Sequence, residues 1–357
     1  MVDHPYKSLP DGAYWRRSVV PAGAAVDPVM GDFIRIGRGD RIATAGSCFA
    51  QHVARHLAAS GFNYLVTESA HPIVPEAAAK AAGYGVYSAR YGNIYTTLQL
   101  VQLFDRAYGR FVPMEDVWAA PEGTGVVDPF RPTIQPGGFA SEAEMRADRA
   151  QHLARVREMF ETLDILVFTL GLTEAWVSTL DGAAYPLCPG VAGGLFDPAR
   201  HEFRNLRVSE VRDQIGQFAE RLRSVNPSAR IVLTVSPVPL AATASGNHVL
   251  PAATYSKSVL RAAAQEAAED LAGIFYFPSY EIITGPQARG RFFADDLREV
   301  TEDGVKQVMR VFLRHAAGID APTDADNPPT AEEDPFTRNM ADWVETMCDE
   351  ALLDQDG

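Results

Sequence analysis

The sequence predicts an α/β fold: a three-layer α/β/α sandwich with a mostly parallel sheet. Short apolar runs alternate along the chain with helical patterns of roughly 10–20 residues, which is typical of parallel strands joined by right-handed crossovers. The runs are apolar throughout and do not alternate with polar residues, which indicates strands covered on both faces. With 357 residues, of which 46% are hydrophobic, the chain is long enough to bury such a core.

The strands and helices follow one another in a regular order. We expect buried strands at residues 42–45, 164–172, 230–239 and 274–280. We expect the main helices at residues 48–59, within 94–111, and at 141–163, 207–227, 254–273 and 300–318. Apolar residues recur in them at helical spacing, as Phe49, Val53 and Leu57 do in the first.

One α/β domain with an extension at each end is expected. Residues 1–38 predict an irregular arm and residues 39–318 the domain, within which 64–160 is a partly helical insert. Residues 319–357 hold 12 acidic residues and one arginine, so this segment supplies −11 of the net charge of −14. We expect an acidic linker there, followed by an amphipathic helix at 337–353 that packs on the domain or binds a protein partner.

Charge, hydropathy and cysteine content exclude several classes of protein. The rest of the chain carries only −3 (−14 less −11), which gives no reason to expect nucleic acid. No run of about 18 apolar residues is present, so no membrane span is expected, and the N-terminus lacks the apolar core of a signal peptide. The three cysteines have neither zinc-site nor disulfide spacing. We expect a cytoplasmic protein with no metal or organic cofactor.

The junction of the first strand and the first helix draws attention to Ser47. In open parallel sheets, sites form at the carboxyl ends of strands, which points to Ser47, to residues 171–174 and to Ser236. A serine at such a junction is often a plain helix N-cap. It can also be a nucleophile, which needs a base to take its proton and donors aimed at the oxyanion. The sequence leaves both readings open.

Several blocks, in a fixed order, resemble the GSCFA family. They are GSCFA at residues 46–50, followed by YGNIYTTLQL, TLGLTEAW, TVSPVP, YSKSVLRAA and YFPSYEI, and they extend over residues 39–315. This family is similar to the SGNH/GDSL esterases and acyltransferases. The resemblance implies the same α/β/α fold and an enzyme whose Ser47 attacks an acyl ester of a hydroxylated small molecule or carbohydrate.

The resemblance also implies donors for the oxyanion. The backbone N–H groups of Ser47 and Gly92 are the first two, and Gly171 matches the glycine of the third SGNH block. That block normally carries an asparagine two residues later, where this chain has Thr173. A hydroxyl is a shorter donor than an amide, so this assignment is the weaker one.

Three further polar residues are candidates beside these blocks. Asn93 and Asn247 are alternative sources of the missing amide. Glu174 follows Thr173 and is either a functional carboxylate or a capping and ion-pairing residue.

The general base is the open question of the sequence. SGNH enzymes end with Asp-x-x-His, and this chain places Asp296 and Glu299 at those positions. A carboxylate is a weak base at pH 7 unless burial raises its pKa. The base is therefore an unusual Glu299, or His248 from the loop after the third strand, with Asp296 orienting it. If neither serves, the protein is a binding module that has lost turnover, and this alternative stays open.

Overall fold

The structure is a computed structural model that describes residues 4–121, 124–319 and 352–353. The described residues divide into two compact units: a larger one within Arg38–Tyr276 and a smaller one formed by residues 4–37 together with residues 277–319. Each unit is described by itself. The predicted acidic linker and its helix at 337–353 fall almost entirely outside the described residues and stay predictions.

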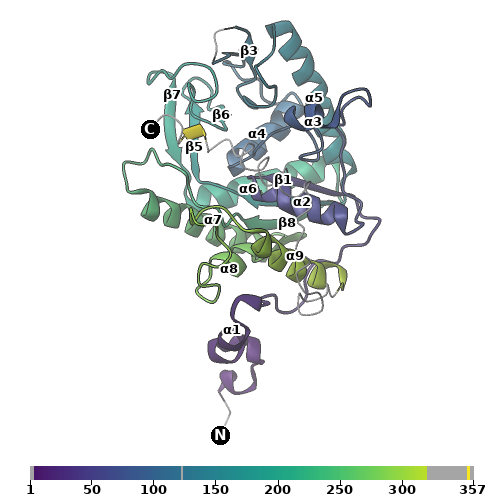
Figure 1. Ribbon diagram of the computed structural model, residues 1–357, viewed down its shortest axis with the longest axis vertical. Coiled ribbons are helices and arrows are strands. Elements are labelled where there is room, and N and C mark those ends of the chain that lie inside the picture. Colours follow the sequence, from purple (N-terminus) through teal and green to yellow (C-terminus); the bar gives the residue numbers. More distant parts are fainter. Residues whose placement is uncertain (1–3, 122–123, 320–351, 354–357) are drawn as a thin grey trace. The chain divides into compact units, whose positions relative to one another are not determined.

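A four-stranded parallel sheet forms the centre of the larger unit (Figure 1). Its strands, in spatial order, are β1 Ile42–Gly46, β4 Ile165–Leu170, β8 Arg230–Val235 and β9 Ile274–Tyr276. Every residue of β1 and β4 is buried, as their unbroken apolar runs predicted. The strand β9 is shorter than predicted because Pro278 lacks the N–H that a ladder needs, and α8 Ser279–Thr284 begins just after it.

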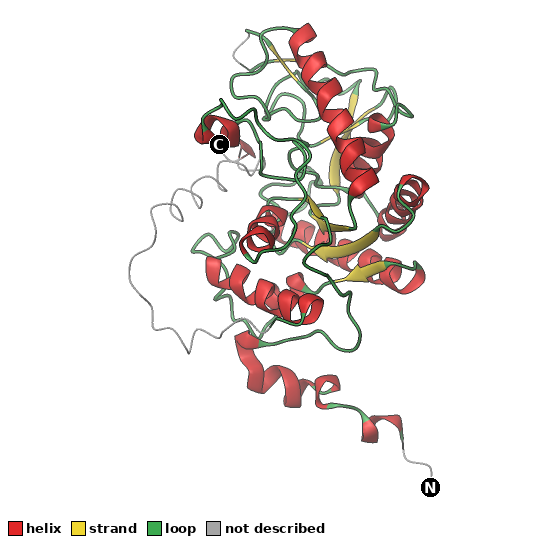
Figure 2. Ribbon diagram, turned by 90° about the vertical axis from the view of Figure 1, so that its right-hand side faces the viewer, coloured by secondary structure: helices red, strands yellow, loops and turns green. Residues whose placement is uncertain are grey.

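Helices lie on both sides of this sheet (Figure 2). The helix α2 Phe49–Ala59 connects β1 to Tyr64, which forms an isolated parallel bridge with Ile42. The helices α6 Val208–Val225 and α7 Val249–Asp270 connect strands in the opposite direction, from β4 to β8 and from β8 to β9. Because such crossovers are right-handed, α2 lies on one face of the sheet and α6 and α7 on the other. This is the predicted α/β/α arrangement.

The segment between β1 and α6 carries elements that the sequence predicted only in part. Its helices are α3 Glu76–Ala81, α4 Thr97–Ala107 and α5 Glu142–Thr162. Its strands form an antiparallel pair, β2 Trp118–Ala119 with β3 Val126–Val127, and an antiparallel sheet of β6 Ala184–Tyr185, β5 Glu174–Ser178 and β7 His201–Asn205. Strands of two to five residues are too short for an alternating pattern to be recognised, so these sheets were not predicted.

The smaller unit joins the N-terminal arm to the last helix, α9 Glu302–Ala317. The Ile36 N–H donates to the Ala316 carbonyl at 2.8 Å. Aromatic rings with centroids 5.1–6.2 Å apart come from both segments: Phe33, Phe277 and Phe312. The arm also contains a short helix, α1 Trp15–Ala22, so it is less irregular than its composition suggested.

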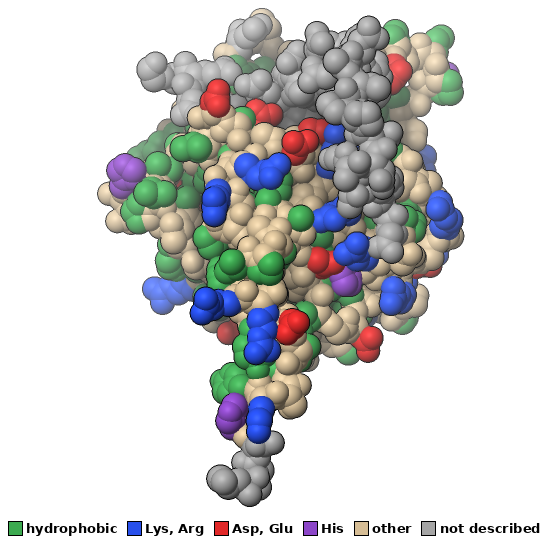
Figure 3. All heavy atoms as spheres, turned by 60° about the horizontal axis from the view of Figure 1, so that its bottom comes forward, with side chains coloured by type: hydrophobic (Ala, Val, Ile, Leu, Met, Phe, Trp, Pro, Cys, Tyr) green, Lys and Arg blue, Asp and Glu red, His purple; other side chains and the backbone are tan. Residues whose placement is uncertain are grey.

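Three observations concern the surface charge, membrane-spanning helices and metal sites. On the face shown in Figure 3, Lys and Arg side chains are interspersed with acidic and apolar ones. Among the described residues, no helix is both long and apolar enough to cross a bilayer. Within the same ranges, no group of three His, Cys, Asp or Glu side chains is arranged to hold a metal ion.

Candidate functional site

Ser47 lies where the carboxyl ends of β1 and β4 meet. The chain leaves β1 toward Tyr64 and leaves β4 in the opposite direction, which makes this edge a topological switch point, the usual place for a ligand in such sheets. The Ser47 N–H donates to the Thr169 carbonyl of β4 at 3.2 Å, so it is not available as the predicted oxyanion donor. Gly46 has φ +135°, and a Cβ there would lie 2.3 Å from that carbonyl oxygen, so only glycine permits this close approach.

The Ser47 hydroxyl makes no hydrogen bond to any described residue, although Ser47 is only 3% exposed. The N-cap residue of α2 is Cys48, and no side chain caps this helix. Ser47 is therefore not the helix cap that serine often is at such a junction. Its oxygen is also buried, so it does not face an open crevice. Leaving a hydroxyl buried and unpaired costs about 1–3 kcal/mol.

One glycine from another segment packs against this serine, and a second lies in a turn that is tied to the end of β1. A Cβ on Gly171 would lie 3.1 Å from the Cβ of Ser47, so the turn after β4 packs directly against it. Gly92 has φ +68°, which favours glycine, and its N–H makes no hydrogen bond within the described chain. The Ile94 N–H donates to the Gly46 carbonyl at 2.8 Å and ties the turn around Gly92 to the end of β1.

The predicted side-chain donors are mostly engaged elsewhere. The Thr173 hydroxyl donates to Asn205 Oδ1 at 2.6 Å, so this hydroxyl does not face an oxyanion. Asn93 accepts from the Tyr87 hydroxyl through its Oδ1, and Asn247 is exposed and donates to a neighbouring serine. Asn205, the last residue of β7, was not predicted, and its Nδ2 makes no hydrogen bond to a described residue.

Glu174 contacts the loop that precedes α7, and His248 is the last residue of that loop. Glu174 is partly buried and accepts from the Thr243 hydroxyl at 2.6 Å, and burial raises its pKa against the lowering effect of that bond. His248 is exposed and caps α7, where its Nδ1 accepts from the Leu250 N–H at 3.2 Å. In this arrangement the Nδ1 lone pair of His248 is engaged by that backbone N–H.

Asp296 and Glu299 belong to the smaller unit, and both are exposed. Asp296 Oδ1 accepts from the backbone N–H groups of Arg298 and Glu299 at 2.9 and 3.0 Å. Asp296 therefore fixes the backbone of this turn and not the Glu299 carboxylate. Their predicted part in catalysis by Ser47 stays a prediction.

Sequence reasoning missed two residues of α7 that hold the turn facing Ser47. Lys257 is only 3% exposed, and its Nζ donates to the Gly171 carbonyl at 2.7 Å. The Ser256 hydroxyl accepts from the Thr173 N–H at 3.0 Å. The sequence did contain a signal, because Lys257 interrupts an apolar helix face, and lysine is rarely buried without a partner.

The profile of the GSCFA family matches residues 41–312. The match spans most of the chain and includes the Ser47 junction, the turn after β4 and the α7 lysine. The chain belongs to the GSCFA family. No curated protein matches it.

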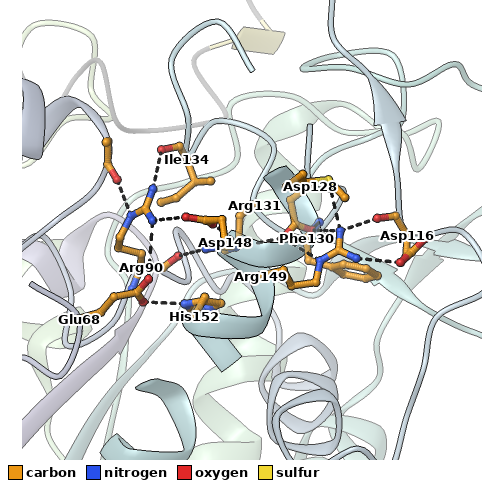
Figure 4. A network of polar contacts seen from close by, with 12 residues as sticks. Glu68, Arg90, Asp116, Asp128, Phe130, Arg131, Ile134, Asp148, Arg149 and His152 are labelled. Atoms are coloured by element: carbon orange, nitrogen blue, oxygen red, sulfur yellow. Dashed lines mark hydrogen bonds and ion pairs between the residues drawn. The ribbon is translucent and has the colours of Figure 1, made fainter. Parts of the chain in front are cut away.

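This GSCFA protein contains a second polar site, a buried charge network against α5 (Figure 4). Arg90 and Arg131 are 2% and 3% exposed. Asp148 accepts from both, at 2.7 Å from Arg90 and 2.8 Å from Arg131. Asp128 is fully buried and accepts from Arg131 at 3.1 Å and Arg149 at 3.0 Å. These arginines hold the pKa of Asp128 well below its usual range, although burial alone would raise it.

A histidine–glutamate pair lies at one end of this network in the GSCFA protein. The Nδ1 of the fully buried His152 is 2.7 Å from Glu68. Burial and the charge of Arg131 lower the pKa of His152 to about 4, against the opposing effect of Glu68. Burial alone would raise the pKa of Glu68. The pKa is nevertheless lowered to about 2, because Glu68 contacts His152 and the Arg90 N–H and lies near the charge of Arg131. At neutral pH, a neutral imidazole therefore donates Nδ1–H to an ionised carboxylate.

Proposed function

We propose that this GSCFA protein is an SGNH-like esterase or O-acyltransferase whose nucleophile is Ser47. The observation that carries the proposal is the unpartnered Ser47 hydroxyl at the switch point between β1 and β4. Buried polar groups usually have a partner, and this one neither caps α2 nor bonds to another described residue. A hydroxyl without a structural partner can be used for chemistry.

The oxyanion donors in this proposal are the N–H of Gly92 and the amide of Asn205. Thr173 holds Oδ1 of Asn205, which leaves Nδ2 as the donor in place of the usual third-block asparagine. Lys257 and Ser256 act as positioning residues because they fix the turn between Gly171 and Thr173. Donors fixed before the reaction stabilise the developing charge without a cost of reorganisation.

The base reaches Ser47 when the site opens. The first turn of α7 packs against Tyr95 and Leu172, and these residues adjoin the turn around Gly171. A movement of this turn would uncover Ser47 and release Nδ1 of His248 from the Leu250 N–H. His248 is therefore the proposed base, and Glu299 with Asp296 is the alternative.

The reaction is an acyl transfer in two steps. Ser47 Oγ attacks the ester carbonyl, the base takes the serine proton and returns it to the departing alcohol. Water or an acceptor hydroxyl then takes the acyl group from the serine. The substrate class, an acyl ester of a hydroxylated small molecule or carbohydrate, and a cytoplasmic location both rest on the sequence alone.

A second function is favoured by one observation. No titratable group is hydrogen-bonded to the Ser47 oxygen, and this oxygen is closed to solvent. A binding module that has kept the fold and lost turnover would have these features.

Reaction with a serine-directed fluorophosphonate probe, and turnover of p-nitrophenyl acetate, distinguish the two functions. We expect labelling and turnover in the wild type and neither in Ser47→Ala. Ser178→Ala is the matched control, since Ser178 is also buried, at 1% exposure, and should keep both. Absence of labelling and turnover in the wild type supports the binding module.

Two further variants identify the base. Removal of a general base lowers the turnover rate by about 10²–10⁴-fold. We expect this loss in His248→Ala and little change in Glu299→Gln. The reverse result assigns the base to Glu299.

A further inference from the structure

Arg106 in α4 is a partly buried cation whose hydrogen bonding is incomplete. Its Nη2 is buried and has no hydrogen-bond partner among the described residues. Its Cζ lies 3.8 Å from the centroid of the Phe130 ring, so one face of the guanidinium is covered. Burial lowers the pKa of Arg106 to about 9, with Asp128 opposing this shift and Arg149 and Arg131 adding to it. The guanidinium is therefore charged at neutral pH and is short of acceptors.

The carboxylates nearby are already in use. Asp116 accepts from Arg146 and Arg149, and Asp128 accepts from Arg131 and Arg149. Asp148 and Glu68 are likewise engaged by the partners described above. Within the described part of the network, the carboxylates of residues 68, 116, 128, 142 and 148 pair with Arg90, Arg131, Arg146, Arg149 and His152. None of these carboxylates forms an ion pair with Arg106.

A cavity adjoins this arginine. Arg106, Phe130, Arg131, His152 and Asn93 are among the residues that line it, and its volume is about 20 Å³ for a water-sized group. This is room for one or two water molecules. His152 uses Nδ1 for Glu68, and its buried Nε2 has no hydrogen-bond partner in the described chain. Two unsatisfied polar groups thus border the same small space.

We propose that this cavity binds a carboxylate group, with the Arg106 guanidinium as its counter-ion. Arginine binds carboxylates through two parallel hydrogen bonds, and the two oxygens of a carboxylate take the place of one or two waters. The anion supplies the hydrogen-bond acceptor that Arg106 Nη2 lacks. His152 Nε2 completes the site, as an acceptor from a bridging water or, once protonated, as a donor to the anion.

The site is independent of the chemistry proposed for Ser47. It shares only the segment of Asn93 and Ile94, whose backbone is tied to Gly46. The carboxylate can belong to a free small acid or to a larger ligand that enters this cavity with its acidic end.

The test uses ¹³C-labelled formate as the probe and the full chain. Binding is followed by the relaxation of the formate signal and, on the protein, by the ring resonances of labelled His152. We expect saturable broadening of the formate signal and a shift of the His152 signal in the wild type. Arg106→Met should weaken formate binding about tenfold or more, the effect of losing a charged hydrogen bond. Methionine keeps an unbranched apolar stem over Phe130, so the variant is expected to fold.

Arg110→Met is the matched control. Arg110 lies on the same segment and over the rings of Phe104 and Tyr108, at 5.2 and 5.8 Å, but it is exposed and does not line the cavity. It should change formate affinity less than twofold. If wild-type protein gives no saturable broadening or leaves His152 unshifted, or if Arg106→Met binds formate as the wild type does, the cavity holds only water and the proposal is wrong. The first two outcomes apply even if Arg106→Met fails to fold. Phosphate added in competition shows whether a larger oxyanion also enters.

Discussion

Polar atoms are buried in the larger unit both at the Ser47 junction and in the charge network around Asp128. The two regions differ in how many hydrogen bonds these buried atoms accept. Asp128 is fully buried and accepts from two arginines and from the Phe130 N–H. The Ser47 oxygen is also buried and accepts from no described residue. A buried charge without partners would unfold the protein, whereas an unpaired neutral hydroxyl costs little enough to be kept. The proposal for Ser47 therefore rests on incomplete pairing and not on burial or charge.

The largest effect is expected from breaking the network. Asp128→Ala leaves Arg131 and Arg149 without their shared acceptor, and losing one partner of a buried charge pair costs about 3–5 kcal/mol. We expect the free energy of unfolding, measured with urea, to fall by that amount. Asp11→Ala is the control, since Asp11 has a side chain 79% exposed and pairs with Arg17 at 3.5 Å; it should change stability by less than about 0.5 kcal/mol. Similar losses of unfolding free energy in the two variants would contradict the expected difference between a buried and an exposed ion pair.

Acidification tests the histidine–glutamate pair. The pKa of His152 is about 4 in the folded protein against 6.5 for the free side chain, so between these values only the unfolded chain takes up this proton. Stability is then complete above pH 6.5 and falls by about 3 kcal/mol as the pH drops to 4. Glu68, with a pKa of about 2 against 4.5, continues the loss below pH 4.5.

The measurement is the unfolding free energy between pH 8 and 4, in the wild type and in His152→Asn. Asparagine keeps a donor at the place of Nδ1 and has no titratable ring. We expect the slope between pH 6.5 and 4 to flatten in this variant, although its stability at pH 8 will be lower. An unchanged slope would assign the pH dependence to other groups.

Substitution of Lys257 should have an intermediate effect on stability. Lys257 is a buried charge, like the residues of the network, but it hydrogen-bonds to the turn that packs against Ser47. Lys257→Met leaves the Gly171 carbonyl without this donor, and we expect a loss of about 1–3 kcal/mol. It should also slow labelling of Ser47, since the turn is less fixed. Lys306→Met, at an exposed position in α9, provides the comparison in urea unfolding and in labelling. A loss confined to stability would make Lys257 a structural residue only.

The smallest effect is expected at Ser47 itself. Removing an unpaired hydroxyl leaves no partner unsatisfied, so Ser47→Ala should leave stability unchanged or raise it by up to about 1 kcal/mol. Ser256 is an equally buried serine whose oxygen accepts from the Thr173 N–H, and Ser256→Ala should lose about 1 kcal/mol. If Ser47→Ala proves the more damaging of the two in thermal unfolding, the Ser47 hydroxyl has a structural role after all.

Local pattern was sufficient to predict the main elements. The helix α7 begins at Val249, five residues before the predicted start, because Pro251 lies in the first turn, where its missing N–H is not needed. The antiparallel sheet of β5, β6 and β7 was missed, because its strands are held by pairing with each other and not by a pattern of their own. The position of Ser47 and the approach of Gly171 follow from where β1 and β4 end.

The sequence by itself determined the layered α/β fold and the place of Ser47 at the edge of the sheet, because periodicity and strand ends are local properties. Only the tertiary structure decided which polar atoms find partners: Thr173 with Asn205, Lys257 with Gly171, and His152 with Glu68. These partners lie 32 to 86 positions apart, and hydrogen bonds act over about 3 Å. Whether an atom such as Ser47 Oγ or Arg106 Nη2 is left unpaired therefore depends on how distant segments pack, which no local pattern records.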